Sequence, residues 1–170
     1  MSNSFGGGGA DLDLSNGATD VFLSVLQFAL SDLATDPWQR ALAHWVAWHD
    51  QNVAGRGTVG FDLEEIHWDP ADFARQKAFL LRVIDTAATG YRWSELCYDP
   101  PYAADHLRRY REVVAGFELP PDFRPAGGYR WPGPDDEECL CRIHRVHCYP
   151  ELGWCRVCDD CGLGDAAGQG

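Results

Sequence analysis

The sequence predicts a mainly α-helical protein, a four-helix-type bundle followed by a small Cys/His-rich zinc-binding module. Four segments repeat apolar residues at spacings of three and four, which is the period of a helix with one buried face. Residues 120–138 are rich in Pro and Gly, and six of the seven cysteines lie in the next 23 residues. We therefore divide the chain into a flexible lead (1–18), an acidic helical domain (19–118), a linker (119–138), a metal-binding module (139–162) and a flexible tail (163–170).

The lead is rich in Gly and Ser, and its glycine run at 6–9 has no side chains that could pack. It also lacks the basic stretch and the apolar stretch of a signal peptide. We therefore expect residues 1–18 to be flexible and the protein to be cytoplasmic.

The first two helices have recognisable starts. Thr19 or Asp20 can cap the first, whose apolar residues recur at helical spacing as far as Leu33. Asp36-Pro37 combines a capping side chain with a proline at the first helical position, where no N–H is needed. A second helix is predicted from there to the glycines that begin at residue 55.

Two further helices follow the same rules. Asp69-Pro70 predicts the start of the third, which should end before Gly90, and Asp99-Pro100 precedes the fourth. Four helices with short connections favour a bundle.

Between the second and third helices, residues 61–63 should form a short strand or an ordered loop, and the stretch 61–72 contains acidic and aromatic residues but no basic one. An aromatic side chain ringed by carboxylates suits a basic partner surface. The candidate partner-binding residues are Asp62, Glu64, Glu65, His67, Trp68 and Asp69.

The net charge of the chain limits the classes of partner that it is expected to bind. Fourteen basic and 26 acidic residues give a formal net charge of −12. Such a field repels phosphate backbones and anionic lipids, so we expect no direct nucleic-acid or membrane binding. No stretch approaches the roughly 18 apolar residues that would cross a bilayer.

The Cys-rich module predicts a metal site, because thiolate and imidazole are ligands that zinc prefers and so short a segment cannot build a core alone. The eight candidate ligands are Cys139, Cys141, His144, His147, Cys148, Cys155, Cys158 and Cys161. One or two zinc ions would fit. In the simplest arrangement one ion takes Cys139, Cys141, Cys158 and Cys161, and the other four form a second site or stay free.

Three alternatives remain for these cysteines. The run Cys155-x2-Cys158-x2-Cys161 resembles the first part of an iron–sulfur motif, although the fourth cysteine with its proline is missing. Disulfides would require an exported protein. Cys155 and Cys158 could be a redox pair, but no βαβ pattern precedes them. Cys97 stands apart and is expected to be a buried small apolar residue.

No catalytic motif is present in the helical part, so we expect a non-enzymatic protein-binding protein. The alternatives are a metalloenzyme that uses His44, His49 and His67 with nearby carboxylates, and a redox or metal-handling protein that uses the cysteines. In its small size, acidity and seven tryptophans the chain resembles bacterial immunity proteins and antitoxins. That resemblance implies binding to a protein partner with a basic surface.

Overall fold

The computed structural model describes residues 2–51, 55–126, 129–148 and 154–163, and it confirms a mainly helical protein. A two-stranded antiparallel hairpin, β1 (Ser2–Gly7) and β2 (Ala10–Ser15), precedes the helices. The helices are α1 (Asn16–Leu33), α2 (Pro37–Ala47), α3 (Phe73–Ala88), α4 (Ala103–Gly116) and the short α5 (Arg156–Asp160), with 3₁₀ turns at Leu63–Glu65 and Trp93–Glu95.

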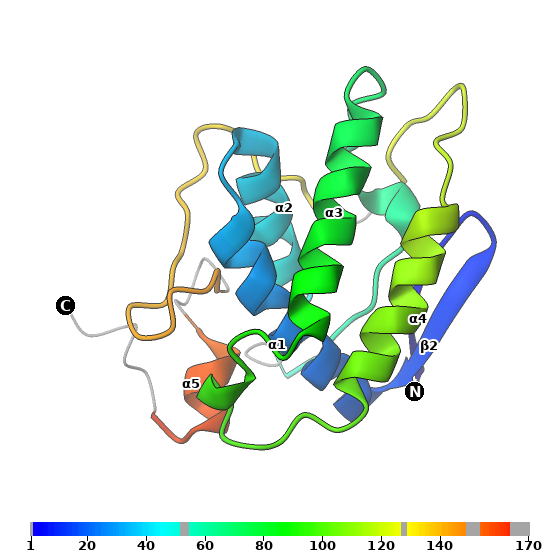
Figure 1. Cartoon of the computed structure of the whole chain (residues 1–170). Coiled ribbons are helices and arrows are strands. Elements are labelled where there is room, and N and C mark those ends of the chain that lie inside the picture. Colours follow the sequence, from blue (N-terminus) through cyan, green and yellow to red (C-terminus); the bar gives the residue numbers. More distant parts are fainter. Residues whose placement is uncertain (1, 52–54, 127–128, 149–153, 164–170) are drawn as a thin grey trace.

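Helix α1 is the centre of the molecule and contacts α2, α3 and α4 (Figure 1). It begins earlier than predicted, because Ser15 rather than Thr19 or Asp20 is its N-cap and accepts a hydrogen bond from the N–H of Ala18. The predicted start of α2 is confirmed, since Asp36 and Gln39 form a reciprocal capping box.

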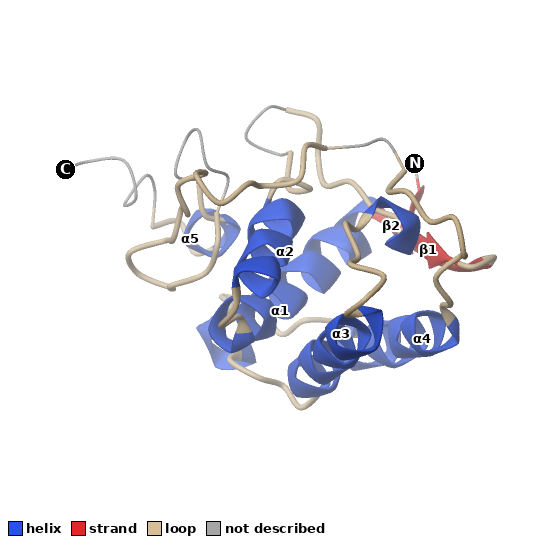
Figure 2. Cartoon of the chain, turned by 90° about the horizontal axis from the view of Figure 1, so that it is seen from above, coloured by secondary structure: helices blue, strands red, loops and turns tan. Residues whose placement is uncertain are grey.

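The hairpin corrects the prediction of a flexible lead at 1–18. Gly8 and Gly9 occupy its tip with φ of +61° and +83°, a conformation that glycine adopts without steric cost. Phe5 and Leu12 point into the core and are almost completely buried. The hairpin packs against α1 and α4, and it lies at the opposite end of the molecule from α5 (Figures 1 and 2).

The predicted linker at 119–138 lies against the helices instead of extending away from them. The ring of Trp131 lies 5.6 Å from that of Trp45 and 6.2 Å from that of Trp38, both on α2. The N–H of Ala126 donates to the carbonyl oxygen of Glu64 at 2.8 Å. An aromatic side chain of this Pro/Gly-rich segment thus packs against the core.

The Cys-rich segment is part of the same core and is not a separate appendage. Val146, Cys148 and Val157 belong to one continuous cluster of buried residues that extends to Phe5 in the hairpin. No helix among the described residues is long and apolar enough to cross a membrane.

Candidate metal centre

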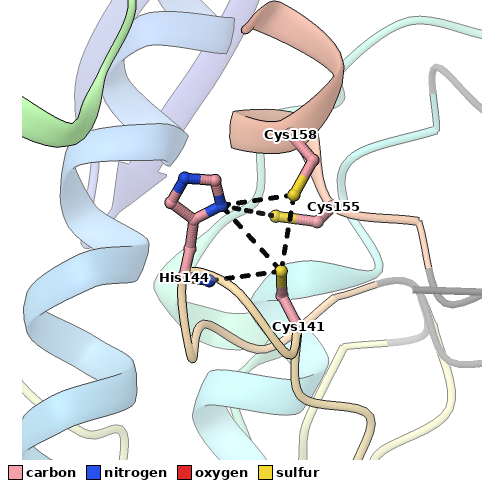
Figure 3. Close-up of side chains that lie close together, drawn as sticks. All are labelled: Cys141, His144, Cys155 and Cys158. Atoms are coloured by element: carbon pink, nitrogen blue, oxygen red, sulfur yellow. Dashed lines mark hydrogen bonds between the residues drawn. The ribbon is translucent and has the colours of Figure 1, made fainter. Parts of the chain in front are cut away.

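Two local structures bring the candidate ligands together. Cys141 and His144 lie on a tight turn, closed by hydrogen bonds from Cys141 N–H to the Val146 carbonyl and from Arg145 N–H to the Cys141 carbonyl, each 2.9 Å. Cys155 is the N-cap residue of α5, and Cys158 lies within that helix. The Cys-x2-Cys spacing therefore places both sulfurs at the start of α5, facing the turn (Figure 3).

The four donor atoms form a compact group in which every pair lies within 4.8 Å. His144 Nδ1 is 3.2 Å from Cys158 Sγ and 3.9 Å from the sulfurs of both Cys141 and Cys155. The sulfurs of Cys141 and Cys158 are 3.5 Å apart. Zinc–ligand bond lengths put the donors of a tetrahedral site about 3.5–3.8 Å apart. The group could therefore hold a metal ion such as zinc.

Burial makes a cation favourable in this group. All four residues are at most 6% exposed. Burial raises the pKa of the Cys158 thiol to about 11 and also raises that of Cys155, whereas it lowers the pKa of His144. Buried thiols thus resist ionisation on their own, and a bound metal ion supplies the positive charge that stabilises thiolates.

Cys141 behaves differently from the other two thiols. Burial acts to raise its pKa, but the backbone N–H groups of His144 and Ile143 donate toward its sulfur, and the net pKa is below the usual value. The N–H of His144 lies 3.4 Å from that sulfur. Backbone donors of this kind stabilise a thiolate ligand.

The predicted ligand set is corrected by a disulfide between Cys97 and Cys161. Cys161 is therefore not available as a metal ligand in this structure, and Cys97 is not the isolated apolar residue that was expected. Disulfides persist mainly in oxidising environments, whereas the sequence led us to expect a cytoplasmic protein without them. The two cysteines are 64 residues apart in sequence, and no local motif connects them.

The three remaining candidates lie outside the four-residue group. The sulfurs of Cys139 and Cys148 face each other at 2.7 Å. His147 turns toward α1, where Ser31 Oγ accepts a hydrogen bond from its backbone N–H at 3.0 Å and lies 2.9 Å from its Nδ1. The structure therefore does not bring Cys139 and Cys161 into one group with Cys141 and Cys158, as the simplest predicted arrangement required.

Two arginines connect the Cys-rich segment, which contains the turn with Cys141 and His144 and helix α5, to the helices. We call this part of the chain the metal segment. The mostly buried guanidinium of Arg156 pairs with Asp50 at 2.7 Å and with Asp20 at 3.1 Å. Arg92 donates to the carbonyl oxygen of His144 and pairs with Asp32 of α1 at 3.0 Å. The turn and α5 are thus both fixed to the helical core.

The histidines of the metalloenzyme alternative do not form a metal-binding group in the described part of the chain. His49 is buried, its Nδ1 lies 3.0 Å from the Trp45 carbonyl oxygen, and burial lowers its pKa to about 4. His44 packs against Trp48, and the ring of His67 stacks on Trp131. These contacts are typical of structural histidines.

In the acidic stretch 61–72, the aromatic side chain that was expected to contact a partner is buried. Trp68 is only 4% exposed, and its Nε1 donates to the carbonyl oxygen of Leu63 at 2.7 Å. It cannot anchor a partner without leaving the core. Glu64 and Glu65 accept hydrogen bonds from the N–H groups of Gly8 and Asp62. Asp69 accepts one from the N–H of Ala71.

Comparisons of this chain with protein-family models, with curated proteins and with solved structures find no match.

Proposed function

We propose that this protein binds one zinc ion through Cys141, His144, Cys155 and Cys158, and that the ion has a structural role. The observation that carries the proposal is the buried group of four donors with spacings near those of a tetrahedron. Three sulfurs and one imidazole are a ligand set typical of structural zinc. Donors this close together suit a single ion better than a multi-iron cluster, in which separate irons take separate thiolates.

A structural role is favoured over catalysis because the protein supplies all four ligands. Catalytic zinc sites keep one position open for water or substrate. Here the four residues are buried, and the turn and α5 close around their donor atoms. The expected effect of the ion is to hold the C-terminal segment on α1 and α2.

Metal analysis of variants tests this proposal. The full-length protein, purified with zinc present, should contain one zinc per chain, and Cys155→Ser should contain little or none. Cobalt substitution should give the visible bands of a tetrahedral thiolate site, which Cys155→Ser should lose.

Cys139→Ser is the matched control for the number of bound ions, because it removes a neighbouring thiol that lies outside the group, and with zinc in excess it should still bind one zinc per chain. If Cys155→Ser held as much zinc as the parent, these residues would not be the ligands.

For the biological role, we propose binding to a protein with a basic surface, as immunity-like and antitoxin-like proteins do. The carboxylates of Asp11 and Asp62 support this proposal, because they lie close together beside Gly6. A Cβ added at Gly6 would lie 2.2 Å from an oxygen of Asp11 and 2.9 Å from an oxygen of Asp62. The pKa of Asp62 is raised by burial and then by the charges of Glu64 and Asp11. A cationic partner would relieve this repulsion.

The acidic-surface proposal predicts a salt-dependent complex with a basic protein encoded beside this chain. Asp11→Asn combined with Asp62→Asn should weaken that complex and reduce its dependence on salt concentration. Asp85→Asn combined with Asp105→Asn removes the same charge elsewhere, from carboxylates paired with Arg111 and Arg108. Equal effects of the two double variants would contradict the assignment of this surface.

A further inference from the structure

Cys139 and Cys148 lie opposite each other on the two arms of the turn that carries Cys141 and His144. The arms pair in antiparallel fashion through Leu140 and His147. The N–H of Cys148 donates to the carbonyl oxygen of Cys139 at 3.0 Å. Directly opposed residues in such a pair have the Cα separation that a disulfide requires.

The two sulfurs are closer than a non-bonded contact. They lie 2.7 Å apart, whereas the neighbouring sulfurs of Cys141 and Cys158 are separated by 3.5 Å. A disulfide bond of about 2.05 Å needs only a small further approach. We infer that Cys139 and Cys148 form a second disulfide, which closes the ten-residue loop that holds two of the metal-binding residues.

This pairing gives each of the seven cysteines a role. Cys97 and Cys161 form the first disulfide, Cys139 and Cys148 the second, and three sulfurs remain beside His144. An odd number of cysteines in a disulfide-containing protein normally leaves a reactive free thiol. Here the odd number matches a site of three thiolates and one imidazole.

Oxidation of the pair requires an external acceptor of two electrons, and a small-molecule disulfide such as oxidised glutathione would serve. Cys139 is partly exposed and Cys148 is buried, so the Cys139 sulfur forms the mixed disulfide and releases one small thiol. The Cys148 sulfur then displaces the second small thiol. The two protein thiols lose two electrons and two protons, which reduce the acceptor to two thiols.

The disulfide would also orient metal ligands. The loop 139–148 contains Cys141 and His144, and closing its ends restricts their positions before an ion binds. This consequence rests on the proposed zinc site, whereas the disulfide itself does not. Groups that orient metal ligands typically change metal affinity by roughly tenfold or more.

Peptide mapping tests the disulfide independently of zinc. The full-length protein, equilibrated with oxidised and reduced glutathione, would be denatured with a chelator, alkylated without reduction and digested with trypsin. Peptide 131–142 should be joined to peptide 146–156, with the alkyl groups on Cys141 and Cys155. Recovery of the two peptides unlinked and each alkylated twice would overturn the inference.

The disulfide between Cys97 and Cys161 is the internal control, because peptide 93–108 should be joined to 157–170 in the same digest. The presence of this control link shows that the protein was under conditions in which its disulfides form. In Cys139→Ser, only the link between 131–142 and 146–156 should be lost, and Cys148 should become alkylated.

The orienting role has its own measurement. Cys139→Ser should transfer its zinc to a chelator about tenfold faster than the oxidised parent does. Equal transfer rates, with the disulfide present in the parent, would show that the bond does not orient the ligands.

Discussion

Arg156 forms ion pairs that connect the metal segment to the helical part of the protein. Its side chain is only 13% exposed and lies between Asp50 and Asp20, with Thr58 also within hydrogen-bonding distance. Burial favours the neutral form of an arginine, yet the nearby carboxylates raise its pKa. The free-energy cost of desolvating the guanidinium is therefore offset by its ion pairs with the carboxylates of Asp50 and Asp20.

Arg156→Met should consequently destabilise the protein by about 2–4 kcal/mol, because the mostly buried ion pairs of Arg156 with Asp50 and Asp20 would both be lost. Urea denaturation measures this change. The matched control is Arg111→Met, which breaks an exposed pair with Asp85 and should have no measurable effect, since exposed ion pairs contribute little. Similar losses for the two variants would mean that burial of the pair is not the cause.

Individual ligands were harder to predict than their clustering. The density of thiols and imidazoles between residues 139 and 161 was sufficient to predict that this region contains a group of side chains that could hold a metal ion. The choice among eight similar donors depends on tertiary contacts. Cys161 is bonded to a cysteine 64 residues earlier, and His147 turns toward Ser31, neither of which leaves a local pattern.

At the scale of elements, the hairpin supplies a part of the core that the helices lack. Phe5 is fully buried and its ring contacts those of Phe22 and Phe61 at 4.7 Å and 5.1 Å, with Tyr110 at 6.0 Å. These residues come from α1, the loop before Leu63–Glu65, and α4. The hairpin therefore fills the end of the space between α1 and α4.

Phe5→Ala should lower the free energy of unfolding by about 3–5 kcal/mol, because a fully buried aromatic ring is replaced by a cavity. Thermal or urea unfolding would measure the loss. Tyr102→Ala is the control, since that side chain is 79% exposed and its removal should cost far less. If Phe5→Ala were as stable as the parent, residues 2–15 would not pack as described.

Helices were predictable from the sequence because their signals are local. Asp36-Pro37 marks the start of α2, and apolar spacing marks the buried faces of α1 and α3. The hairpin was missed because strand β1, Ser-Asn-Ser-Phe-Gly-Gly, is poor in the β-branched residues typical of strands. The available signal is the pair of glycines at the turn, although a run of glycines is equally typical of a flexible segment.

At the scale of the whole molecule, the buried apolar residues that the structure describes form one core, which joins regions that the sequence suggested were separate. Leu23 of α1 and Val46 of α2 line a small pocket together with Val146, Cys148 and Val157 of the C-terminal segment, and all five belong to the same cluster of buried residues. The linker composition of residues 119–138 predicted separation, but Trp131 and the buried contacts of the metal segment oppose it. Composition describes the backbone freedom of a segment, whereas its few large side chains decide where it lies.

One core predicts one cooperative unfolding transition. Heating the zinc-loaded protein should give coincident changes in helical circular dichroism and tryptophan fluorescence. A chelator should lower the midpoint for both signals by roughly 10 °C or more, since each kcal/mol shifts the midpoint of a domain this size by about 2–4 °C. Cys155→Ser should unfold near the chelated midpoint and respond little to chelator. Two transitions, with only the smaller one sensitive to zinc, would instead mean that the metal segment folds apart from the helices.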